Sequence, residues 1–153
     1  MVIEFIIEDL DTPLNHDAFK DMLNAFIFGM PGAYLESDEL GIEINRQILR
    51  YIVKGLGKDH VDQIDKKTGQ TPLILACDFL TDPIVIEILV EGGCHVNAVD
   101  CNDLMPLKIM KERLRKDPDN YDLQDIYSFL QRKGARKTWR AKNNFVKNEI
   151  NLR

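Results

Sequence analysis

Apolar residues recur at intervals of three and four in the middle of the chain. One such run follows Pro72 and a second follows Pro83, and Gly92 and Gly93 come directly after the second run. Proline is tolerated in the first turn of a helix, because its missing N–H has no partner there. Glycine is the usual residue just past a helix end. The pattern therefore predicts two short helices, the first of them capped by Thr71.

The sequence also contains an internal repeat, which bears on the whole fold. Residues 61–73 are similar to residues 96–107, and their prolines, Pro72 and Pro106, are 34 residues apart. The first copy has one extra residue in its turn. We expect each copy to begin a unit that consists of a turn, a short helix, a second turn and a second helix.

The residues before these copies predict another helical pair. A first helix over residues 16–28 follows Asn15, its expected N-cap, and a second helix ends at the glycines of residues 55–57. Residues 30–40 form the segment that joins them. The apolar faces of the two helices consist of Phe19, Met22, Leu23 and Phe26, and of Ile48, Leu49, Ile52 and Val53. Residues 1–10 fit either a short strand or a cap segment.

The middle of the chain resembles the ankyrin-repeat family. The family pattern runs D-x-x-G-x-T-P-L-H-x-A-A, then I-V-x-x-L-L, then G-A-D-V-N-A. Residues 69–77 match the first block, residues 84–89 the second and residues 93–98 the third, in the same order and at the same spacing. Together the three blocks cover one full repeat.

The next unit departs from the family pattern. Asp103, Met105 and Lys108 stand where the family has glycine, threonine and histidine, and the second helix of this unit aligns at residues 126–135. The polar cluster at residues 116–121 is the expected place of an insertion between its two helices.

The resemblance implies an all-α fold, an ankyrin-repeat solenoid of stacked helix-turn-helix units. We expect a single domain over residues 1–153, with an atypical N-terminal cap unit, a well-matched repeat, a degenerate repeat and a basic C-terminal helix. These parts span residues 1–60, 61–98, 99–135 and 136–153. Terminal units of a repeat stack are commonly atypical.

Composition and charge fit one soluble domain with an uneven charge distribution. The 153 residues are 44% hydrophobic and 29% charged, with a net charge of −5. Residues 131–153 carry eight basic side chains and one acid, whereas residues 1–43 carry ten acids and one base. The basic end could contact nucleic acid or an anionic membrane, and the acidic part could attract a basic partner. No secretory leader is apparent, so we expect a cytoplasmic protein.

The cysteines and histidines do not form a pattern typical of catalysis or metal binding. Cys77 and Cys94 stand at positions that ankyrin repeats fill with alanine, so the resemblance implies that they pack in the interior. Cys101 falls on a turn and should be exposed. A zinc site of Cys94, His95 and Cys101 lacks a fourth ligand and the usual spacing. His95 is expected to make hydrogen bonds within its loop, and we expect no metal, no cofactor and no enzymatic activity.

In the ankyrin family, variable residues of the turn tips and first helices contact partner proteins. The resemblance therefore implies partner contacts at Lys66, Lys67, Gln70, Asp78, Phe79, Cys101, Asn102, Leu104, Glu112 and Arg113. Phe79 is the candidate anchor, since a buried aromatic side chain often dominates interface affinity. The alternative is that Phe79 packs beneath the next repeat.

We thus expect a non-catalytic protein-protein interaction module, monomeric when free. One alternative is an inhibitor or regulatory subunit of a single enzyme, including a bacterial effector-type adaptor acting in a host cytosol. The other is binding of nucleic acid or membrane through the basic end.

Overall fold

The computed structural model describes residues 16–36, 38–62, 64–66 and 68–137. Throughout these residues the fold is all-α, as the sequence predicts, with six helices and no strand. In chain order the helices are α2 (His16–Glu36), α3 (Glu39–Leu56), α4 (Pro72–Phe79), α5 (Pro83–Glu91), α6 (Pro106–Lys116) and α7 (Tyr121–Arg132).

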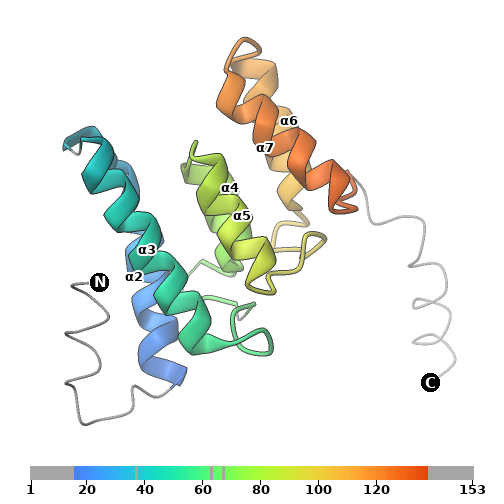
Figure 1. The fold of residues 1–153 in the computed structure, drawn as a ribbon. Coiled ribbons are helices and arrows are strands. Elements are labelled where there is room, and N and C mark those ends of the chain that lie inside the picture. The colour runs from blue at the N-terminus through green and yellow to red at the C-terminus, as the bar shows by residue number, and fades with distance from the viewer. Residues whose placement is uncertain (1–15, 37, 63, 67, 138–153) are drawn as a thin grey trace, which may run out of the picture.

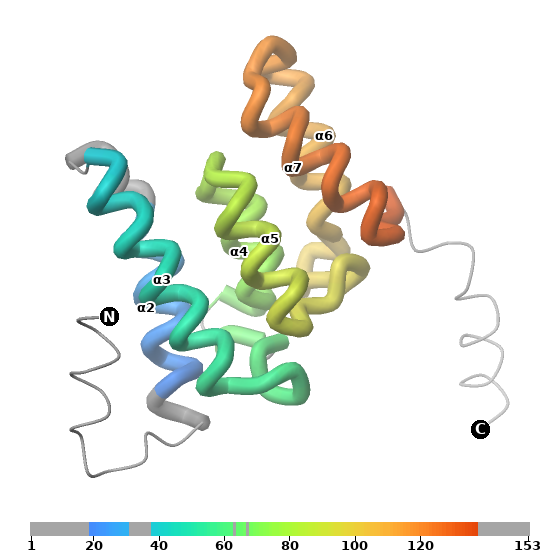
Figure 2. The backbone as a smooth tube through the Cα atoms, viewed as in Figure 1, coloured from blue at the N-terminus to red at the C-terminus, as the bar shows by residue number. Residues whose placement is uncertain are grey.

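The helices pair into three hairpins that lie side by side in chain order (Figure 1). Within each hairpin α2 packs on α3, α4 on α5, and α6 on α7. Between hairpins α4 contacts both α2 and α6, and α5 contacts both α3 and α7. The helices therefore form two rows, an inner row of α2, α4 and α6 and an outer row of α3, α5 and α7, which can be followed along the chain in Figure 2.

Local capping explains where the middle hairpin begins. The Thr71 hydroxyl accepts a hydrogen bond from the Ile74 N–H at 3.3 Å, and the Asp82 carboxylate accepts one from the Ile84 N–H at 3.0 Å. In each case proline occupies the first helical turn. The helix starts predicted from Thr71 and from Pro83 are thus confirmed, and both follow from satisfying or removing amide groups that lack partners inside the helix.

The core runs through all three hairpins and is centred on α4. Every residue of α4 from Pro72 to Cys77 is buried. Such a helix is apolar on all sides, which is the pattern expected when neighbours cover it completely. Large side chains of α2, α3 and α5 complete this core and are fully buried, namely Leu23, Ile27, Met30, Leu49, Ile52, Leu56, Ile86 and Leu89.

Polar contacts fix each hairpin to the next. Arg46 of α3 donates two hydrogen bonds to the Asp82 carboxylate, at 2.9 and 3.1 Å, so this carboxylate both caps α5 and binds α3. The side chain of Asn97 donates to the Gly134 carbonyl and accepts from the Arg136 N–H. A bidentate arginine–carboxylate pair has a narrowly defined geometry, and so do hydrogen bonds between a side chain and the backbone. These contacts therefore help to set the position of each hairpin relative to the next.

The two turns that precede α4 and α6 have related hydrogen bonds. Asp65 N–H donates to the Gln70 carbonyl at 2.8 Å, and Asp100 N–H donates to the Leu104 carbonyl at 3.1 Å. The carboxylate of each aspartate then accepts backbone N–H groups of its own turn. The internal repeat detected in the sequence is therefore also a repeat of turn geometry.

The first hairpin differs from expectation at its tip. Instead of ending near residue 28, α2 continues to Glu36 through a proline and a glycine, and α3 starts at Glu39 after the N-cap Asp38. The long joining segment expected over residues 30–40 is therefore wrong. Burial of Ile27 and Met30 supports the helix across a sequence that would otherwise break it. The expectations for residues 1–10, for Asn15 and for a helix over residues 138–153 lie outside the described residues.

The turn before α6 supplies a stability prediction. Asp103 has a φ of 57°, a left-handed conformation that Gly69 adopts in the preceding turn with a φ of 67°. Side chains raise the energy of this conformation, although aspartate tolerates it better than most. We expect Asp103→Gly to raise the free energy of unfolding by about 0.5–1 kcal/mol and the Tm by a few degrees.

Thermal unfolding followed by circular dichroism measures this change. Gly69→Ala serves as the opposite control and should lower the Tm. The backbone there is already left-handed, and an added Cβ would lie 2.8 Å from Cys101 Sγ. An unchanged or lower Tm for Asp103→Gly would contradict the proposed strain.

Candidate functional site

A pair of aromatic rings joins the first and second hairpins on the inner row. Phe79 is the last residue of α4, and its ring centroid lies 5.7 Å from that of Phe28 on α2, with the ring planes tilted by 46°. The two side chains are 50% and 47% exposed. Phe79 therefore does not pack beneath the following hairpin; it lies against the preceding one, with half of its surface open to solvent.

Phe28 was not among the residues expected to bind a partner. On the predicted apolar face of α2, Phe19 and Leu23 are buried, Phe26 is partly buried and Met22 is 37% exposed, and Phe28 lies on another side of the helix. A large aromatic residue outside a helical apolar stripe is itself a signal, because it has no core position to fill. Only the packing of α2 on α4 reveals that Phe28 meets Phe79.

Arg113, an expected partner contact, connects the second and third hairpins. Its Nη1 atom donates hydrogen bonds to the carbonyls of Cys77 and Leu80 at the C-terminal end of α4, the first of them 2.7 Å long. Partial burial lowers the pKa of Arg113, and nearby Cys77 and Asp78 oppose this shift. Arg113 thus caps α4 from α6, in addition to any role in binding.

The remaining expected contacts divide between helix ends and turn tips. Asp78 is exposed beside Phe79, and Glu112 is exposed and forms an ion pair with Arg115 at 3.1 Å. At the turn tips Lys66, Cys101 and Asn102 are exposed, whereas Gln70 and Leu104 are partly buried. Lys67 lies outside the described residues. The two turns touch, since the Cys101 thiol lies 3.8 Å from the Thr68 carbonyl oxygen.

A continuous surface, called here the inner aromatic surface, crosses all three inner helices. It consists of Phe28, Phe79, Asp78 and Arg113. Ring contact connects Phe28 to Phe79, the chain connects Phe79 to Asp78, and Arg113 reaches the end of α4 from α6. The surface offers two half-exposed apolar rings beside one acidic and one basic group. Such an arrangement suits recognition by contact area and charge.

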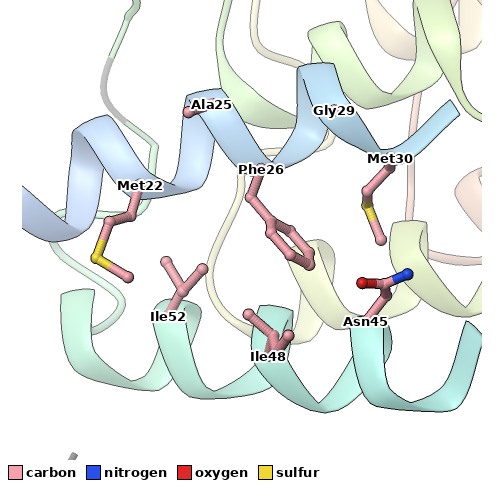
Figure 3. A pocket seen from close by; sticks show the side chains of 8 residues that line it. All are labelled: Met22, Ala25, Phe26, Gly29, Met30, Asn45, Ile48 and Ile52. Carbon is pink, nitrogen blue, oxygen red and sulfur yellow. The ribbon is translucent and has the colours of Figure 1, made fainter. Parts of the chain in front are cut away.

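A separate apolar groove runs between α2 and α3. In Figure 3, Met22, Phe26 and Met30 of α2 point toward Ile52, Ile48 and Asn45 of α3. Ala25 and Gly29 complete its lining, and its volume is about 460 Å³. Of these eight residues Asn45 alone is polar, and none is charged.

The thiols are placed as the sequence predicts, with Cys77 and Cys94 buried and Cys101 exposed. Burial raises the pKa of Cys77 to about 12, and it raises the pKa of Cys94 still further. His95 Nδ1 accepts a hydrogen bond from the Asn97 N–H at 3.3 Å, which confirms its expected place in a loop network. Among the described residues, no cluster of three or more His, Cys, Asp or Glu side chains could hold a metal ion.

Comparison of the chain with protein-family models, curated proteins and solved structures found no match. Within the described part of the chain, none of the helices combines the length and apolarity that a membrane span requires. The functional argument therefore depends on the surfaces themselves.

The position of Arg113 predicts a structural contribution that can be measured. Arg113→Ala removes the partner of two carbonyl groups at the end of α4, so we expect unfolding free energy to fall by about 1–3 kcal/mol. Arg115→Ala is the matched control, because its side chain is 72% exposed and its ion pair with Glu112 contributes little. Equal urea midpoints for the two variants would show that the Arg113 hydrogen bonds do not stabilise the fold.

The burial of two thiols predicts selective reactivity. Because the thiolate is the nucleophile, a thiol with a raised pKa stays protonated and unreactive at pH 8. The folded protein should therefore react with Ellman's reagent at Cys101 alone, and at all three cysteines in guanidinium chloride. Rapid reaction of two or three thiols in the native protein would contradict the burial of Cys77 and Cys94.

Proposed function

We propose that this chain is a non-catalytic protein-binding module of the ankyrin-repeat type. Support comes from three helical hairpins in two rows, from turns with related hydrogen bonds before α4 and α6, and from the repeat of 34 residues between Pro72 and Pro106. Each hairpin packs on its neighbour, as in repeat proteins whose units cannot bury their apolar faces alone.

The observation that carries the binding proposal is the half-exposed pair of Phe28 and Phe79. Exposed phenylalanine rings are costly in water, and a pair of them on one surface is typical of an interaction site. Each ring restricts the other, so little side-chain entropy remains to be lost when a partner covers them. The pair is therefore suited to act as the anchor of an interface, flanked by Asp78 and Arg113.

A rigid scaffold supports this anchor. Phe79 ends a helix in which Pro72 to Cys77 are all buried, and Phe28 follows directly after Ile27, which is fully buried. Backbone beneath both rings is thus held by the core. Recognition by such a surface needs little rearrangement, so we propose docking of a preformed surface onto one partner protein.

Substitution of both rings tests the proposal. We expect Phe28→Ala with Phe79→Ala to reduce affinity for a partner at least 10-fold, because loss of an anchor commonly costs more than about 1.4 kcal/mol of binding. Since both rings are half-exposed, the Tm should fall by only a few degrees. The partner is first isolated by affinity purification with the unmodified chain, and its Kd is then measured by calorimetry.

Tyr121→Ala is the matched control, because Tyr121 is an 80% exposed aromatic residue at the start of α7 on the outer row. It should leave the Kd unchanged. Equal affinity of the double variant and the unmodified chain would exclude the aromatic pair as the anchor. If the isolated partner is an enzyme, the same variants in an activity assay distinguish inhibition from scaffolding.

A further inference from the structure

The groove between α2 and α3 belongs to a face of the first hairpin that no other described element covers. Arg46 and Val53 of α3 face the second hairpin, through Asp82 and through the close approach to Gly92. The groove is lined from other sides of α2 and α3, and no residue of α4 to α7 contributes to it.

This uncovered apolar area extends beyond the groove itself. Along α3, Ile44 and Leu40 continue from Ile48 at intervals of four residues and are 44% and 68% exposed. On α2, Met22 is 37% exposed at the edge of the groove. A terminal unit of a repeat stack needs a polar outer surface for solubility, and this face does not provide one.

The residues before α2 have the sequence that such a face requires. Between residues 3 and 10 the apolar positions Ile3, Ile6, Ile7 and Leu10 recur at helical spacing, whereas Glu8 falls on the opposite side of that helical pattern, with Glu4 and Asp9 on either side of it. One side of this segment would be apolar, and the other would carry the acidic residues together with Phe5.

The length of this segment and the length of its connection to α2 also match the groove. Nine residues of helix, from 2 to 10, are about 13 Å long, and Met22 to Met30 along the groove span about 12 Å. Residues 11–15, which contain Pro13, would connect the segment to α2 and could extend to about 17 Å. This is enough for the chain to reverse direction and return along α2.

We propose that residues 2–10 bind in the α2–α3 groove as an amphipathic helix and cover the open end of the stack. Ile3, Ile6, Ile7 and Leu10 then lie against the uncharged lining, where the hydrophobic effect favours them, and the acidic side faces solvent. The proposal concerns a different face from the inner aromatic surface and does not depend on the proposed binding function.

Disulfide trapping in the full chain tests this placement. Cys101 is exposed and is first replaced by serine, whereas Cys77 and Cys94 are buried and can remain. In this background Ile7→Cys is combined with Ala25→Cys, an exposed position of the groove lining. Mild oxidation should give an intramolecular disulfide, detected by mass spectrometry and by the mobility of the monomer on a non-reducing gel.

Glu8→Cys combined with Ala25→Cys is the matched control, because Glu8 faces away from the groove in the proposed helix. We expect at least fivefold more intramolecular disulfide for the Ile7 pair than for the Glu8 pair. Adding Ile6→Asp to the Ile7 pair should reduce the yield several-fold and lower the Tm by about 5 °C, whereas adding Phe28→Ala with Phe79→Ala should not reduce the yield.

Two results would overturn the proposal. Equal yields for the Ile7 and Glu8 pairs would show that the segment does not lie along the groove with this orientation. Disulfide-linked dimers in place of the monomeric product would show that a second copy of the chain occupies the groove.

Discussion

The burial of α4 is the constraint on which the rest of the structure depends. This helix has eight residues, far fewer than an isolated helix needs to be stable in water, and its residues from Pro72 to Cys77 are all buried. It is therefore stable only between α2 and α6 and against α5. The long first hairpin and the third hairpin supply the apolar surfaces that cover the short second hairpin.

Local sequence signals predicted the parts of the fold that depend on neighbouring residues. Thr71, Pro72 and Pro83 satisfy or remove amide groups at the first turn of a helix, so their positions determine helix starts almost independently of the tertiary structure. Asp103 was recognisable in the sequence as a departure from the glycine of the repeat pattern, and the backbone there is left-handed. These are effects of a few residues in sequence, and one sequence suffices to find them.

Features that depend on distant residues were not predictable in the same way. The contact between Phe28 and Phe79 spans 51 positions of the sequence. Arg113 was expected to face a partner, yet it donates hydrogen bonds to carbonyls on another hairpin. The continuation of α2 beyond residue 30 depends on tertiary burial that outweighs a helix-breaking sequence. Of the four residues of the inner aromatic surface, Asp78, Phe79 and Arg113 were thus among the expected partner contacts, and Phe28 was not.

The way in which the hairpins touch has a thermodynamic consequence. The principal contacts run from the first hairpin to the second and from the second to the third, and the side chains of Asp82 and Arg113 are among the polar links on either side of the middle hairpin. A change on α6, such as the binding of a partner, can alter the stability of α2 mainly through α4 and α5. The smallest hairpin therefore controls the cooperativity of the whole stack, and loosening it would separate the two ends into independently fluctuating units.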